Sequence, residues 1–191
     1  THMDDPDPVL FNTQGRPMSP ADEIRIVDWD GKPAKPGEPG ELLTRGPYTI
    51  RGYYRAPEHN ANAFTADGFY RTGDVVRLTA SGNLSVEGRV KDLINRGGEK
   101  ISPLEVDAVM LKHPAVAGAV CFGVPDEKYG EEGHAAVVLK GEASEEDIIA
   151  FCRNHLADFK TPKKLYIADM LPQTATGKIQ RRFMAAYFHE K

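Results

Sequence analysis

The sequence predicts an α+β fold in two parts: a small β-barrel-like subdomain over residues 1–90 and a compact α+β domain over residues 91–191. Short β-like runs broken by glycine and proline fill the first part, whereas helix-like segments with recognisable caps fill the second. Between them, residues 88–102 form a polar, glycine-rich stretch without an apolar stripe, which fits either a solvated linker or a hinge carrying working groups. A chain of 191 residues is long enough for two small domains.

The composition is that of an ordinary globular protein. The chain is 40% hydrophobic and 27% charged, and its net charge of −4 argues against general affinity for nucleic acid. It has no signal peptide and no run of roughly 18 apolar residues, so we expect a cytoplasmic protein without a membrane partner. Cys121 and Cys152 lie in apolar runs and are expected to be buried free thiols. Residues 1–3 are interpreted as a tag remnant, and the missing initiating region is compatible with a piece of a longer protein.

Several short strands are expected in the first part. Alternating or aromatic-rich runs occur at residues 23–28, 41–45, 49–54, 69–78 and 84–87, with turn signals between them. One helical turn is expected at residues 60–64. Strands at this spacing favour a small barrel or a folded sheet.

Asp74 is the candidate binding residue of this first part. An aspartate is unusual inside a strand, and the preceding Gly73 lets the backbone approach a ligand closely. A carboxylate there can accept two hydrogen bonds from a ribose diol, as acidic groups do in nucleotide sites. The alternative is an edge-strand aspartate that is simply solvated.

Two helices of the second part carry capping signals. Ser102 and Glu105 match a capping box with Pro103 at the first helical position, and Ser144 precedes an acidic first turn. The predicted apolar faces are Leu104, Ala108 and Leu111 in the first helix, Ile148, Phe151, Cys152 and Leu156 in the second, and Ile179, Phe183 and Tyr187 in a closing helix over residues 179–188. Strands are expected at residues 116–124, 135–139 and 165–167.

Lys178 is the candidate catalytic residue of the second part. It lies in a Thr/Gly-rich loop at the expected start of the closing helix, where the helix dipole disfavours a cation by roughly 0.3–1 kcal/mol. A cation there makes more sense if an anion such as phosphate joins it. The alternative is an exposed loop lysine, and the upstream glycine spacing of a Walker loop is absent.

Other polar groups give weaker signals. The basic run at residues 160–164 is interpreted as a solvated face, with a carrier or phosphate contact as the alternative. The six histidines show no metal-ligand spacing, so no metal site is predicted.

Four motifs occur in a fixed order, at residues 40–54, 70–74, 88–102 and 176–178. In that order they resemble the acyl- and aryl-adenylating enzyme superfamily, which includes acyl-CoA synthetases, peptide-synthetase adenylation domains and luciferases. Within it the chain looks most similar to the 2,3-dihydroxybenzoate–AMP ligases of siderophore synthesis, through residues 13–18, 44–54, 58–60 and 94–100. Residues 101–105 also match general acyl-CoA ligases, which leaves the final acceptor open.

The resemblance implies an ATP-dependent ligase with two steps. An aryl or other carboxylic acid and ATP with Mg²⁺ first give an acyl-adenylate and pyrophosphate. A thiol then takes the acyl group, either on the phosphopantetheine of an aryl carrier protein or on CoA.

The resemblance also assigns roles to residues of this sequence. The adenylation lysine corresponds to Lys178, and the hinge between the two parts to Lys91. The nucleotide-binding positions correspond to Asp74, Arg89 and Asn95, and the pantetheine tunnel of the second step to Gly97, Gly98 and Lys100.

The same resemblance implies what this chain lacks. The family's phosphate-binding loop, acid pocket and adenine pocket belong to a large N-terminal region outside this sequence, so ATP and Mg²⁺ would be bound mainly there. The fragment alone is therefore expected to be inactive. Two other functions remain open, an AMP-forming acid–CoA ligase and a module that chiefly docks a carrier protein.

Overall fold

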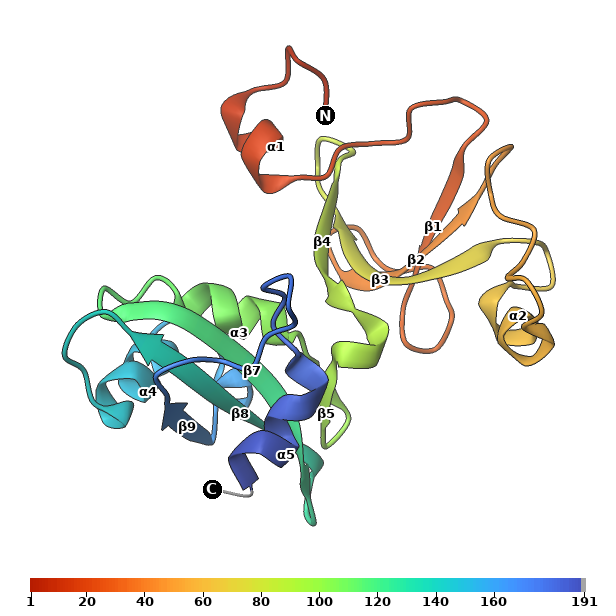
Figure 1. The fold of residues 1–191 in the computed structure, drawn as a ribbon. Coiled ribbons are helices and arrows are strands. Elements are labelled where there is room, and N and C mark those ends of the chain that lie inside the picture. The colour runs from red at the N-terminus through yellow and green to blue at the C-terminus, as the bar shows by residue number, and fades with distance from the viewer. Residues whose placement is uncertain (190–191) are drawn as a thin grey trace. The chain divides into compact units, whose positions relative to one another are not determined.

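The computed structural model describes residues 1–189. The chain divides into two compact units, Thr1–Lys91 and Asp92–Lys191 (Figure 1). Each unit has its own sheet and its own hydrophobic core, and the α+β fold class is confirmed. No helix among residues 1–189 is long and apolar enough to cross a membrane.

The first unit is built on a four-stranded antiparallel sheet in the order β1-β2-β3-β4. Its strands are β1 (Glu23–Val27), β2 (Pro39–Arg45), β3 (Tyr70–Leu78) and β4 (Leu84–Arg89), accompanied by the short helices α1 (Asp7–Asn12) and α2 (Pro57–Ala63). The described strands form an open sheet and no closed barrel, which agrees with the folded sheet that the sequence favours as the alternative to a small barrel. The outer edge of β4 pairs with the chain at Gln14 and Gly15. The Leu84 N–H donates to the Gly15 carbonyl (2.7 Å), and the Gln14 N–H donates to the Leu84 carbonyl (2.8 Å).

The expected strand at residues 49–54 is also absent. Gly52 has a φ of +150° and Arg55 one of +51°, conformations that interrupt an extended strand. The backbone of Tyr53 is bonded by a side chain, because Asn60 accepts a hydrogen bond from its N–H (2.7 Å) and donates one to its C=O (2.9 Å). This segment is therefore a loop held against α2, which begins with Pro57 in its first turn.

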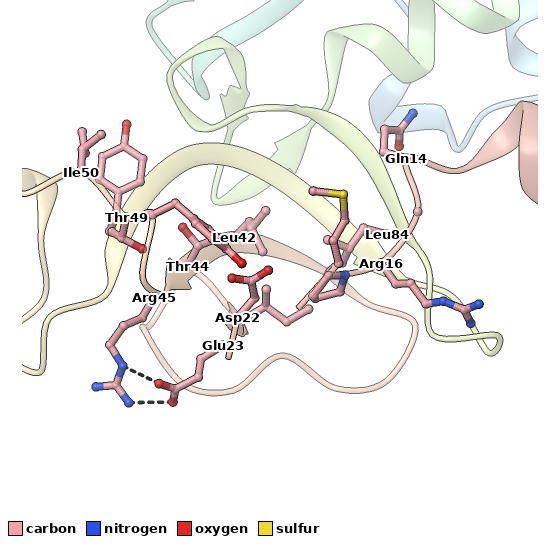
Figure 2. Close-up of a pocket in the computed structure, with 17 residues that line it drawn as sticks. Gln14, Arg16, Asp22, Glu23, Leu42, Thr44, Arg45, Thr49, Ile50 and Leu84 are labelled. Atoms are coloured by element: carbon pink, nitrogen blue, oxygen red, sulfur yellow. Dashed lines mark hydrogen bonds and ion pairs between the residues drawn. The ribbon is translucent and has the colours of Figure 1, made fainter. Parts of the chain in front are cut away.

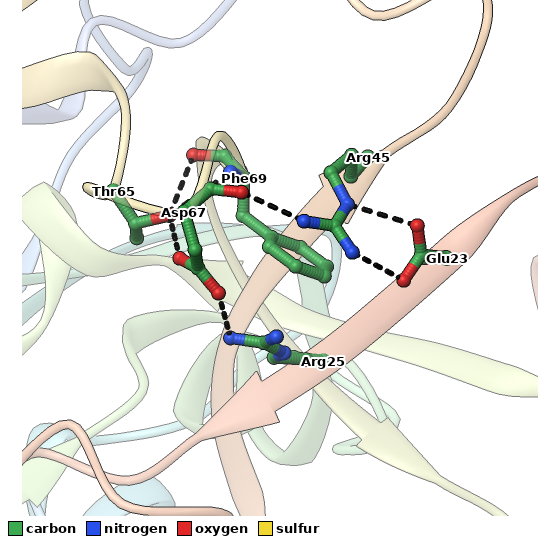
Figure 3. Close-up of polar contacts among 6 residues, drawn as sticks. All are labelled: Glu23, Arg25, Arg45, Thr65, Asp67 and Phe69. Atoms are coloured by element: carbon green, nitrogen blue, oxygen red, sulfur yellow. Dashed lines mark hydrogen bonds and ion pairs between the residues drawn. The ribbon is translucent and has the colours of Figure 1, made fainter.

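Phe69 closes the small core of the first unit. Its side chain is 1% exposed and packs with Val27 and Leu43. Two guanidinium groups also face its ring, with the Cζ atoms of Arg25 and Arg45 at 3.9 and 4.4 Å from the centroid (Figure 3). Cation–π contacts therefore add to the apolar contacts that cover this ring.

Carboxylates hold both arginines in place over that ring. Glu23 binds the Arg45 guanidinium through two hydrogen bonds of 2.8 and 2.6 Å, and Asp67 pairs with Arg25 at 2.7 Å (Figure 3). A hydrogen bond from Thr65, and then one from Arg25, lower the pKa of Asp67. The network joins β1 and β2 to the turn that precedes β3.

The second unit contains a five-stranded sheet covered on both faces. Its strands are β5 (Ile94–Arg96), β6 (Glu99–Ile101), β7 (Val116–Asp126), β8 (Gly130–Leu139) and β9 (Lys164–Ile167), in the order β6-β5-β8-β7 with β9 parallel to β8. Alternate residues of β7 enter two different cores. Cys121 packs with α3 (Pro103–Met110) and α4 (Glu145–Arg153), whereas Phe122 packs with α5 (Met184–His189).

The N-terminal ends of the two longer helices differ. Ser144 caps α4 as predicted, and it forms a full capping box with Asp147, with both reciprocal hydrogen bonds present. The expected capping box at Ser102 is wrong, because its side chain makes no capping hydrogen bond and Glu105 instead binds the Lys160 ammonium at 2.7 and 2.8 Å. Glu105 therefore forms a long-range ion pair with Lys160 in place of the local capping box.

The predicted inner faces of two helices are wrong as well. In α3, Leu104 and Leu111 are 45% and 48% exposed, while Val106 and Met110 are buried. At the C-terminus the α-helix begins only at Met184, after a 3₁₀ turn over Arg181–Phe183. This later start turns Met184 and Phe188 inward and leaves Phe183 and Tyr187 exposed. The face of α4 is confirmed, with Ile148 and Cys152 buried, Phe151 and Leu156 partly buried, and both cysteines free.

Candidate functional site

The structure brings Asp74 and Arg89 together within the first unit. They are direct cross-strand partners on β3 and β4, and Arg89 Nε lies 3.1 Å from Asp74 Oδ1. Arg89 also donates a longer hydrogen bond of 3.4 Å to the Thr72 carbonyl. Both side chains are partly exposed, so a carboxylate that accepts hydrogen bonds and a cation stand side by side at an accessible place.

The backbone around Gly73 aims the Asp74 side chain. Gly73 has a φ of +70°, a left-handed conformation that favours glycine, and the β3–β4 register shifts between Val75 and Val76. The Thr72 hydroxyl accepts a hydrogen bond from the Asp74 N–H (3.0 Å) and donates one to the Leu42 carbonyl (2.9 Å). Sequence reasoning missed this role of Thr72, although a threonine two residues before an aspartate is a typical local hydrogen-bonding partner.

The second unit gathers the residues of the central loop into a hairpin. Asn95 on β5 and Lys100 on β6 are direct partners, and Gly97 and Gly98 form the turn with φ values of +59° and +97°. The Asn95 N–H donates to the Glu131 carboxylate at 2.7 Å. This leaves the Asn95 side chain exposed beside the two glycines.

Tyr129 is the residue at this turn that sequence reasoning missed. Its carbonyl accepts a hydrogen bond from the Gly97 N–H (2.8 Å), and a Cβ added to Gly97 would lie 3.3 Å from the Tyr129 ring. The Arg96 guanidinium stacks over that ring at 4.0 Å, and a hydrogen bond from Lys128 is the main cause that lowers the pKa of Tyr129. A side chain at Gly97 would therefore meet a strained backbone and a crowded neighbour.

Lys178 lies in a small hairpin loop, residues 173–179, and not at the start of a helix. Gln173 and Ile179 bridge its ends, the Thr174 N–H donates to the Lys178 carbonyl (2.9 Å), and the Lys178 N–H donates to the Thr174 hydroxyl (3.1 Å). Since the helix begins later, the expected opposition between the Lys178 charge and a helix dipole is wrong. The side chain is exposed, and among residues 1–189 no acidic group forms an ion pair with it. The loop thus presents an unpaired ammonium group on an ordered backbone.

Lys91 lies at the boundary of the two units, exposed in a 3₁₀ turn over Val90–Asp92. Of the predicted site residues, Asp74 and Arg89 belong to the first unit. The hairpin residues and Lys178 belong to the second. Within the described residues no group of three or more His, Cys, Asp or Glu side chains could hold a metal ion.

One pocket lies within the first unit alone. It encloses about 570 Å³ between the chain near Gln14, the β1–β2 sheet and the loop near Thr49 (Figure 2). Its lining is mostly apolar. At its rim the Glu23 carboxylate binds the Arg45 guanidinium. Neither Asp74 nor Arg89 lines it, so the pocket does not coincide with the candidate nucleotide site.

Two family models match the chain in succession. The AMP-binding enzyme model matches residues 1–54, and the AMP-binding enzyme C-terminal domain model matches residues 105–178. The fold and both matches agree with the order of motifs in the sequence. The chain therefore belongs to the family of AMP-binding, adenylate-forming enzymes.

Individual relatives support the same assignment. The chain is similar to a 2,3-dihydroxybenzoate-AMP ligase from Bacillus subtilis, at 49% identity over 100% of this chain and 36% of the relative. It is 54% identical to a salicylyl-CoA synthase / salicylate adenylyltransferase from a Streptomyces species, over 95% of this chain and 34% of the relative. The chain thus spans about a third of the length of the curated relatives it matches.

A solved structure shows the same fold. The O-succinylbenzoate coenzyme A synthetase of Bacillus subtilis, in complex with ATP and magnesium ion, superposes with a TM-score of 0.78 and 37% identity. The match covers 90% of this chain and 35% of that chain.

Proposed function

We propose that this chain is the C-terminal part of an ATP-dependent aryl acid–AMP ligase. The whole protein activates 2,3-dihydroxybenzoate or a similar acid in the cytoplasm and passes the acyl group to the thiol of a carrier protein. The observation that carries the proposal is the hydrogen-bonded 173–179 loop, which presents the Lys178 ammonium group without an ion-pair partner among residues 1–189. Similarity over the full chain to a 2,3-dihydroxybenzoate-AMP ligase supports the choice of acid.

In the first step Lys178 stabilises charge that develops between two anions. An oxygen of the acid's carboxylate bonds to the α-phosphorus of ATP, and the bond from that phosphorus to the bridging oxygen of pyrophosphate breaks. A flexible ammonium can contact both the carboxylate and the α-phosphate while this negative charge redistributes. Among residues 1–189 no carboxylate pairs with Lys178, which leaves its ammonium group available for this contact.

Asp74 and Arg89 bind the nucleotide in this proposal. The Asp74 carboxylate accepts hydrogen bonds from the ribose hydroxyls, and Arg89 contacts the ribose or phosphate side, since the two lie 3.1 Å apart at an exposed position. Mg²⁺ neutralises charge on the phosphates of ATP. ATP and the family's N-terminal region would hold this ion, since the described residues contain no group of three or more His, Cys, Asp or Glu side chains that could do so.

In the second step the thiol sulfur bonds to the acyl carbon, the bond from that carbon to the AMP oxygen breaks, and the thiol proton is lost. Gly97, Gly98 and Lys100 line the path of the pantetheine arm, where a side chain at either glycine would obstruct it, and Asn95 faces the nucleotide. Between the two steps, a rotation about Lys91 moves Lys178 away from the nucleotide and brings this hairpin to it.

The chain alone is expected to form no acyl-adenylate, because it supplies only part of the nucleotide site and no acid pocket. Pyrophosphate exchange with 2,3-dihydroxybenzoate and salicylate, measured for this chain and for the full-length protein, tests this. Exchange is expected only in the full-length protein. Clear turnover by the chain alone would contradict the proposed division of the site.

The acceptor separates the leading proposal from an acid–CoA ligase, the alternative that the similarity to a salicylyl-CoA synthase favours. With the full-length protein and preformed acyl-adenylate, we expect the phosphopantetheinylated carrier to react at least tenfold faster than CoA at equal concentration. Equal or faster thioester formation on CoA would show that CoA is the acceptor in place of the carrier protein. The apo-carrier, which has no thiol arm, is the control.

A further inference from the structure

The outer edge of β7 is covered at one point by side chains from both faces of the sheet. β7 pairs only with β8, so alternate residues point their backbone N–H and C=O groups away from any strand. At Cys121 the N–H donates to Asp107 Oδ1 at 2.5 Å, and the C=O accepts a hydrogen bond from Arg181 Nη1. A sheet edge that would otherwise be open is thereby closed.

Asp107 and Arg181 also bind each other. Arg181 Nη2 donates to Asp107 Oδ2 at 2.6 Å, and the Asp107 side chain is largely buried. Burial raises the pKa of Asp107, and Arg181 opposes that rise. A buried carboxylate with one arginine partner and one backbone donor depends on both, since removing the cation leaves an uncompensated buried charge.

This edge clamp, defined as Asp107, Arg181 and the backbone of Cys121, connects two different parts of the second unit. Asp107 belongs to α3, whose core lies on one face of the sheet. Arg181 follows the 173–179 loop by two residues and precedes α5, whose core lies on the other face. Ile179 packs against that second core, and the Gln180 N–H donates to the Pro172 carbonyl (3.1 Å). Besides the hydrogen bonds within the hairpin, the side of the loop that carries Lys178 is therefore anchored to the rest of the second unit by this apolar contact and by the clamp.

We infer that Arg181 is a positioning residue for Lys178. It holds the end of the 173–179 loop against β7 and so fixes where the ammonium group stands, without touching the substrate. The inference rests on the proposed adenylation role of Lys178, and its physical basis is independent of that role. A short segment connects Lys178 to Arg181, whose guanidinium binds the Asp107 carboxylate through two nitrogen atoms. A displacement of about 1 Å at a reacting group can lower the rate roughly 100-fold.

The test compares Arg181→Gln with Arg182→Gln in the full-length protein. Arg182 is the matched control, because it is adjacent and exposed, with its guanidinium over the Phe183 ring at 4.6 Å. For Arg181→Gln we expect kcat of pyrophosphate exchange to fall at least tenfold with KM for ATP within threefold. Thioester formation from preformed acyl-adenylate should stay within threefold, because that step does not use Lys178. Arg182→Gln should leave both steps unchanged.

Conservative variants guard against a loss of folding. Arg181→Lys keeps the positive charge but lacks the planar guanidinium that forms two parallel hydrogen bonds. Its rate of pyrophosphate exchange should lie between those of the wild type and Arg181→Gln. Asp107→Asn removes the other half of the pair and should reproduce the selective loss. Equal losses in both steps, or no intermediate behaviour for Arg181→Lys, would reduce Arg181 to a purely structural residue and overturn the inference.

Hydrogen exchange of the chain itself separates this inference from the proposed function. The amides of Gly177 and Lys178 donate to the Thr174 carbonyl and hydroxyl, so their exchange reports the order of the loop. Arg181→Gln should accelerate both at least tenfold, and Arg182→Gln should not. Unchanged exchange would overturn the clamp even if Lys178 is catalytic. Accelerated exchange would support it even if Lys178→Ala retained adenylation.

Discussion

Replacing Lys178 by alanine in the full-length protein should lower the rate of acyl-adenylate formation by roughly 100-fold or more, the usual cost of removing one preorganised group that stabilises transition-state charge. The ammonium stands exposed and unpaired on an ordered loop, so the change removes a charge without breaking a described ion pair. Pyrophosphate exchange measures the effect. Thioester formation from preformed acyl-adenylate should remain within threefold.

Lys140→Ala is the matched control for that variant, because Lys140 is an exposed lysine that follows β8 and lies outside every proposed site. It should leave both steps unchanged. Full adenylation activity in Lys178→Ala would remove the catalytic role of the lysine. It would favour the alternative in which the second unit chiefly docks a carrier protein.

Replacing Lys91 by proline should slow thioester formation at least tenfold while adenylation stays within threefold. Lys91 lies in the exposed 3₁₀ turn at the boundary of the two units, and proline fixes its φ near −65° and restricts the residue before it. A hinge restricted in this way can still support one arrangement but exchanges slowly into the other. Single-turnover measurements of each step, starting from acid and ATP or from preformed acyl-adenylate, give the two rates.

Lys91→Ala supplies the comparison, since it removes the charge and keeps the backbone free. It should behave like the wild type in both steps. Equal loss of both steps in Lys91→Pro would count against an alternation about this residue. A selective loss of adenylation would show that proline favours the thiolation arrangement, which contradicts the expected direction.

Local signals in the sequence predicted those elements whose formation depends on neighbouring residues. Ser144 caps its helix as expected, through hydrogen bonds with Asp147, which is close to it in sequence. The apolar runs at residues 116–124 and 135–139 predicted most of β7 and the second half of β8, whereas the polar first half of β8 carries no such signal. In α3, by contrast, two apolar stripes compete. Packing against the sheet, which the local sequence does not specify, buries Val106 and Met110, whereas Leu104 stays exposed.

In the candidate site, too, local signals predict single residues, and long-range contacts determine how those residues are placed. Asp74 could be singled out from its place after Gly73, but its contact with Arg89 depends on the β3–β4 register, which shifts within the pair. The approach of Tyr129 to Gly97 arises from the end of another hairpin. Asp107 and Arg181 are 74 residues apart, so no local pattern announces their pairing. Long-range contacts of this kind decide where the functional groups stand.

The division into two self-contained cores has a use in protein engineering. Among the described residues, the cluster around Phe69 draws only on the first unit, and both clusters beside the β7–β8 sheet draw only on the second. A recombinant hybrid joined after Lys91, with the second unit taken from a relative, would therefore inherit each interior whole. Residue 91 is the natural crossover point for shuffling this protein with its homologues.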